Sequence, residues 1–111
     1  ASGPCLVRYE GNDEDLMRLA SETSFSLSCG HTFVVFMKDG FPINVLNAIK
    51  ICQEVCHVIC ATANPLQVIV AENEQGRGIM GIIDGFRPKG IETAEDKNQR
   101  KELLRKFRYK L

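Results

Sequence analysis

The chain has 111 residues, of which 44% are hydrophobic and 25% charged, values that are ordinary for a single globular domain. This composition excludes collagen-like, coiled-coil and intrinsically disordered proteins. The apolar runs are too short to cross a bilayer and no secretory signal precedes the first predicted strand, so we expect a cytoplasmic protein with no membrane partner. A chain of this length buries only a modest core, and we therefore expect a homo-oligomer.

The predicted elements begin with a short strand over Cys5–Glu10, which contains Val and Tyr in loose alternation. Asn12 or Asp13 then caps a helix whose apolar residues recur at steps of three and four until Cys29-Gly30 ends it. The run His31–Lys38 is almost wholly apolar and β-branched or aromatic, which predicts a central strand buried on both faces.

The second half of the chain carries more strand signals than helix signals. Pro42 opens a predicted helix that continues to about Gln53, and Cys56–Ala61 is the third predicted strand. Leu66–Ala71 and Ile79–Ile83 are the fourth and fifth, separated by a polar, Gly-rich connection. Thr93 with Asp96 resembles a capping box at the start of a basic C-terminal helix.

The predicted order is therefore β-α-β-α-β-β-β-α. It indicates an α+β or α/β fold in which helices pack on a layered mixed sheet of about five strands.

The formal net charge is zero, yet the charges are unevenly distributed. Residues 1–85 hold 5 basic and 10 acidic residues, whereas residues 86–111 hold 9 basic and 4 acidic residues. The basic tail can dock on its own acidic body, which is the interpretation we favour, on a neighbouring subunit, or on a phosphate-bearing partner. We expect no nucleic-acid partner.

The five cysteines form no CxxC pair and lack the tight paired spacings of a zinc site, since only the last three are regularly spaced, four residues apart. We therefore predict free thiols and no metal. The cysteines are Cys5, Cys29, Cys52, Cys56 and Cys60.

The densest polar cluster of the sequence lies between the last two predicted strands. Arg77 stands between Gly76 and Gly78, with Glu72 and Gln75 nearby. The glycines let the backbone approach an anion closely, and the Arg77 guanidinium can bind a carboxylate or a phosphate. No Walker A or dinucleotide-binding fingerprint is present. A hairpin turn with glycines at positive φ is the alternative, and the pattern alone favours it.

Three further positions are candidates for chemistry, each with a structural alternative. Asn64 suits a purine edge or ribose hydroxyls, or an Asn-Pro turn. Asp39 caps a helix or acts as a base, with Asn44 on the helix that follows. His31, at the mouth of an apolar strand, acts as a nucleophile or proton carrier, or bonds a backbone carbonyl.

Five ordered strings resemble the adenosine-specific kinases, a small prokaryotic and mainly archaeal family. They are RYEGND (8–13), GHTFVVF (30–36), DGFPINVLNAIK (39–50), CATANP (60–65) and AENEQGRGIMGIIDG (71–85). The resemblance implies one domain over residues 1–111, corresponding to the C-terminal two-thirds of the family domain, so that its N-terminal part is absent from this chain and a companion segment supplies it. The resemblance also implies that the protein forms a homo-oligomer, namely a trimer.

The same resemblance implies recognition of adenosine or AMP and a phosphorylated histidine. In the resulting hypothesis His31 and Asp39 are catalytic, and the substrate is bound by Asn44, Asn64, Glu72, Gln75, Gly76, Arg77 and Gly78. A phosphoryl donor is implied but not identified, and no other cofactor is expected. The alternatives are a nucleotide sensor without turnover and a structural interaction subunit.

Overall fold

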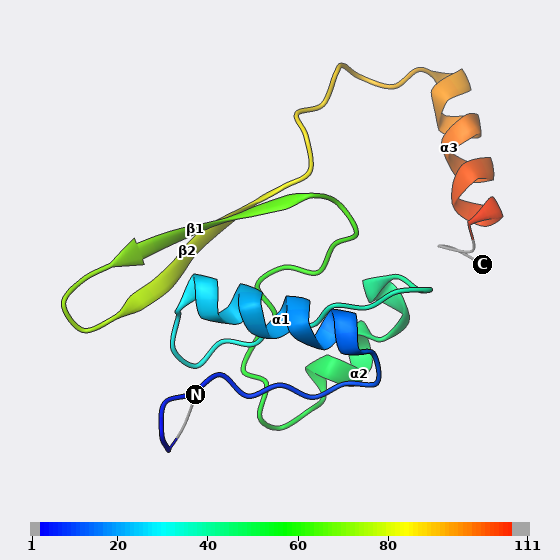
Figure 1. Cartoon of the computed structure of the whole chain (residues 1–111). Helices are drawn as coiled ribbons and strands as arrows, with labels where there is room; N and C mark the ends of the chain where they lie inside the picture. Colours follow the sequence, from blue (N-terminus) through cyan, green and yellow to red (C-terminus); the bar gives the residue numbers. More distant parts are fainter. Residues whose placement is uncertain (1–2, 108–111) are drawn as a thin grey trace.

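The computed structural model describes residues 3–107 and contains three α-helices, one short 3-10 helix and one β-hairpin (Figure 1). The elements in chain order are α1 (Glu14–Leu27), η1 (Pro42–Asn44), α2 (Leu46–Lys50), β1 (Leu66–Glu72), β2 (Arg77–Asp84) and α3 (Ala94–Lys106). In Figure 1, α1 and α2 lie below the hairpin, and α3 stands apart at the end of an extended linker.

The first and last helices begin where their capping residues predict. The Asp13 side chain accepts a hydrogen bond from Leu16 N at 2.9 Å, and Thr93 forms a reciprocal capping box with Asp96. Both caps satisfy backbone donors that have no partner inside the helix. At its other end α1 stops at Leu27, because Ser28 adopts the left-handed conformation with φ 52°.

The helix predicted from Pro42 to Gln53 is divided in two. The Asn44 side chain accepts a hydrogen bond from Phe41 N at 2.7 Å, which closes the 3-10 turn η1. α2 then runs for five residues only and ends at Lys50.

The hairpin joins β1 and β2 in antiparallel register, from Leu66 opposite Asp84 to Glu72 opposite Arg77. A register shift between Ile69 and Val70 leaves Met80 as the extra residue of a β-bulge. Both faces of the hairpin carry apolar side chains, a pattern typical of strands inside a larger sheet.

The prediction of a layered sheet of about five strands is wrong: within residues 3–107 the sheet has two strands. The segments Cys5–Glu10, His31–Lys38 and Cys56–Ala61 form no strand. Their composition signals apolar, β-branched character, but a strand also needs a neighbour for its backbone donors and acceptors. None of the three segments has such a neighbour in the described part of the chain.

The fold is open. No side chain among the described residues is fully buried, and Phe25 and Met80 are 74% and 71% exposed. The radius of gyration is 17.1 Å, whereas a compact domain of this size has a value of about 13 Å. The apolar surface that a core would normally cover is therefore available for contacts.

Two depressions flank α1. A cavity of about 130 Å³ lies between the start of α1 and residues 34–36, and Gly11 lines it. A Cβ at Gly11 would stand 2.8 Å from Met17 Cγ, so this close approach requires glycine. The second depression is an open groove of about 510 Å³, here called the 6–26 groove, lined by Leu6, Val7, Tyr9, Ser21, Glu22, Phe25 and Ser26.

Within residues 3–107, no helix combines the length and apolar character needed to span a membrane.

Candidate functional site

The structure distributes the predicted site residues over three places rather than one. The hairpin tip lies against the C-terminal end of α1 and holds Glu72, Gln75, Gly76, Arg77 and Gly78, with His31 four residues beyond the helix. The N-terminal end of α1 lies near Asp39 and Asn44. Asn64 is at the base of the hairpin, at the far end of both strands from Arg77.

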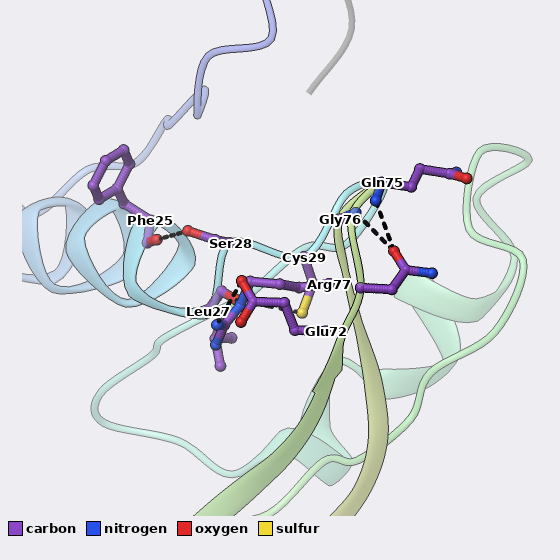
Figure 2. A network of polar contacts seen from close by, with 9 residues as sticks. Phe25, Leu27, Ser28, Cys29, Glu72, Gln75, Gly76 and Arg77 are labelled. Carbon is purple, nitrogen blue, oxygen red and sulfur yellow. Dashed lines mark hydrogen bonds and ion pairs between the residues drawn. The ribbon is translucent and has the colours of Figure 1, made fainter.

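Arg77 joins the hairpin tip to α1. Its Nε donates a hydrogen bond to the carbonyl oxygen of Leu27 at 2.8 Å, and its Nη1 lies 3.6 Å from Glu72 Oε1 (Figure 2). α1 has no basic residue in its own last turn, so Arg77 supplies the positive charge that the negative end of the helix dipole favours. One edge of the guanidinium is thereby fixed, while the side chain stays 32% exposed.

The turn at the hairpin tip is held by Asn73. Its side-chain oxygen accepts hydrogen bonds from Gln75 N at 2.9 Å and Gly76 N at 3.1 Å, as Figure 2 shows. The Gly76 amide is thus already engaged within the turn. Gly76 and Gly78 do not have positive φ, so the expected glycine-dependent turn geometry is not what the hairpin uses.

The loop that carries His31 follows directly from the end of α1. His31 has φ 56°, and Ser28 has φ 52°; both are left-handed conformations that non-glycine residues rarely adopt. Thr32 Oγ1 donates to Cys29 O at 2.8 Å and holds the loop between them. Such strained backbone is concentrated at functional sites, which supports His31 as a candidate.

The opposite end of α1 carries an ion pair. Asp13, the cap of α1, is paired with Lys38, and this hydrogen bond to Lys38 is the main cause that lowers the pKa of Asp13. The same pair raises the pKa of Lys38. Residues 28–38 therefore return along α1 from its C-terminal to its N-terminal end (Figure 1).

That path separates two residues predicted to act together. α1 is 14 residues long, or about 21 Å, and His31 and Asp39 lie toward its opposite ends. Asp39 also has left-handed backbone, with φ 61°. The side-chain oxygen of Asn44 is engaged with Phe41 N and belongs to the η1 turn.

Asp84, the last residue of β2, organises the base of the hairpin. Its Oδ1 accepts hydrogen bonds from Thr62 Oγ1 at 2.7 Å and from Asn64 Nδ2 at 3.2 Å. Cys60 Sγ lies 3.9 Å from Asp84 Oδ2. Partial burial is the main cause that raises the pKa of the Cys60 thiol, and the nearby charge of Asp84 raises it further. Gly85 has φ 74° beside Asn64, a conformation that favours glycine.

The described residues contain no group of three or more His, Cys, Asp or Glu side chains arranged to hold a metal ion. The five cysteines are free; Cys29 and Cys60 are partly buried and the others exposed.

Comparison with known proteins identifies relatives over almost the full chain. The family model described as adenosine specific kinase matches residues 1–110. Among solved structures, the chain is similar to the PH1918 protein from Pyrococcus horikoshii OT3, with a TM-score of 0.89 and 46% sequence identity over 99% of this chain and 68% of that one. No curated protein matches.

The extent of the family match corrects one prediction. Because the family model aligns with residues 1–110, the prediction that the N-terminal part of the family domain is absent is wrong. The motifs that led to the family are distributed along that whole alignment.

Proposed function

Because the chain belongs to the adenosine specific kinase family, we propose that it binds adenosine or AMP and transfers a phosphoryl group through His31. The proposal places the phosphate at the hairpin tip, beside the C-terminal end of α1. Its support is the bond from Arg77 to Leu27, which brings a guanidinium to the end of the helix from which the His31 loop begins.

Arg77 suits the role of a phosphate ligand. Its Nε is held by a backbone carbonyl, which orients the guanidinium, while its pair with Glu72 is long and partly exposed. Such an exposed pair contributes less than about 1 kcal/mol, so a phosphate competes with it effectively. A phosphate also accepts two parallel hydrogen bonds from a guanidinium, which a lysine cannot provide.

The proposed reaction has two transfers, with a phosphoanhydride as the donor class. The neutral imidazole of His31 attacks the terminal phosphorus, the P–O bond to the leaving group breaks, and the other ring nitrogen releases its proton. A hydroxyl of adenosine then attacks the phosphorus and the N–P bond breaks. A carboxylate takes the hydroxyl proton, and the released imidazole regains a proton from solvent at its other ring nitrogen. Glu72 is the carboxylate paired with Arg77 at this end of α1, so we assign to it the role that the sequence analysis gave to Asp39.

Calorimetric titration of adenosine and AMP into wild type and Arg77→Lys tests the phosphate contact. A charge-assisted hydrogen bond contributes about 1.5–3 kcal/mol, so the variant should bind AMP roughly tenfold or more weakly and adenosine almost unchanged. Arg100→Lys on α3, which removes a guanidinium paired with Glu92, is the matched control and should affect neither ligand. Equal losses for both ligands would contradict a phosphate contact.

The histidine is tested separately, and the chain provides its own control because it has only two histidines. Protein incubated with ATP labelled at the γ-phosphate should carry an acid-labile label in wild type and His57→Asn, but not in His31→Asn. Adenosine should discharge that label. AMP binding without any label would favour the nucleotide sensor over the phosphotransferase.

A further inference from the structure

α3 is a helix without a binding partner in the described part of the chain. All of its residues are exposed except Leu104, and it makes no extensive contact with another helix or strand of residues 3–107. Figure 1 shows it at the end of the linker, away from α1 and the hairpin. A free helix of 13 residues is only marginally stable in water, so its local caps alone do not account for it.

One side of α3 is suited to a contact with protein. Leu103, Leu104 and Phe107 lie close together at helical spacing, and Leu103 and Phe107 are 52% and 58% exposed. Lys101 and Arg105 flank this apolar patch. The region after residue 85 has a net charge of +5, and the rest of the chain has −5.

The 6–26 groove offers the complementary surface. Leu6 and Phe25 line it with 66% and 74% of their surface exposed, which provides apolar area for Leu103 and Phe107. Glu22 also lines the groove. An apolar centre bordered by the Glu22 carboxylate thus matches an apolar patch bordered by basic side chains.

We propose that α3 of one copy of this chain binds in the 6–26 groove of a second copy. The linker directs α3 away from its own body, and the Thr93 capping box and the Arg100–Glu92 ion pair hold the helix onto the end of that linker. Each copy therefore offers both a helix and a groove. The helix and the groove are different surfaces of each copy. Two copies can therefore exchange their α3 helices in a dimer, or several copies can bind head to tail in a closed ring.

The charge pattern provides a direct test by sedimentation velocity at micromolar concentrations of full-length protein. Wild type should be an oligomer that dissociates as salt is raised, since the charged rim is screened. Leu103→Gln combined with Phe107→Gln should weaken association about tenfold or more, because the anchors at the centre of an interface dominate its energy. Ile91→Gln, at a residue 97% exposed in the linker, is the matched control and should leave association unchanged.

Charge reversal then identifies the groove. Glu22→Lys and Lys101→Glu should each weaken association, and the protein that carries both should recover much of it. Lys89→Glu in the linker, with the same change of charge, should not rescue Glu22→Lys. A monomeric wild type would overturn the proposal in favour of docking within one chain, and an oligomer insensitive to the α3 variants would overturn it in favour of another interface.

Discussion

α1 and α3 are of nearly equal length and are capped in the same way, yet they are held by different parts of the molecule. α1 is tied at its start to Lys38 and at its end to Arg77, residues from two distant segments of the chain. Among residues 3–107, the polar side-chain contacts of α3 are local and involve Thr93, Asp96 and Glu92. α1 therefore organises the candidate site, whereas α3 remains available to a partner.

Proline substitution should give the largest difference between α1 and α3 in the effect on the free energy of unfolding. Ala20→Pro, within α1, removes a backbone hydrogen bond and introduces a steric clash, so it should lower the free energy of unfolding by about 3 kcal/mol or more. Gln99→Pro, within α3, should reduce helical ellipticity but leave the main urea midpoint of the dissociated protein unchanged. Equal shifts of the midpoint, measured by circular dichroism, would show that α3 is part of the same cooperative unit.

A smaller difference is expected from removing Arg77, which contacts the end of α1 from β2, and Arg100, which lies in α3. Arg77→Ala should destabilise the protein by about 1 kcal/mol, because it breaks a partly buried hydrogen bond to the end of α1. Arg100→Ala removes only an exposed ion pair within the α3 region, and its effect on the unfolding midpoint should be smaller. Urea titration of the two variants side by side measures both losses of stability. The loss for Arg77→Ala should be the larger one.

The smallest expected difference between α1 and α3 concerns how their stability depends on acidic pH. The pKa of Asp13 is lowered in the folded state, chiefly by Lys38, so its stabilising contribution is complete above the ordinary value of 3.8 and is lost as the pH falls through the lower folded value. Asp96 behaves in the same way, through its hydrogen bonds with Thr93.

We therefore expect Asp13→Asn to reduce the acid dependence of the urea midpoint below about pH 4, because asparagine keeps the cap but does not titrate. Asp96→Asn should change only the acid dependence of α3 helicity. If both variants changed the midpoint equally, the distinction between the helices would not hold.

Local signals in the sequence predicted the parts of the fold that depend on neighbouring residues. Asp13 and Thr93 mark helix starts because a capping bond reaches only three residues ahead, and the β1–β2 hairpin follows from two apolar runs around a short polar turn. The sheet could not be predicted in this way. Whether His31–Lys38 becomes a strand depends on a neighbour elsewhere in space, and composition does not reveal that neighbour.

The candidate site shows the same limit. The motif around Arg77 was visible in the sequence, but its partner Leu27 lies 50 residues earlier and offers only a backbone carbonyl. Asp84 was overlooked because Asp-Gly after a strand is typical of a turn, although its carboxylate joins Thr62 and Asn64. Spacing along the chain does not indicate which end of a hairpin a side chain occupies.

The central claim, that phosphate is bound where the hairpin tip meets α1, is tested most directly by backbone amide NMR shifts during titration with AMP and with adenosine. The account predicts that the difference between the two ligands is largest at residues 27–31 and 72–78 and negligible in α3. A difference centred on Thr62, Asn64 and Asp84, or on Asp13 and Asp39, would contradict it and move the phosphate to the hairpin base or to the start of α1.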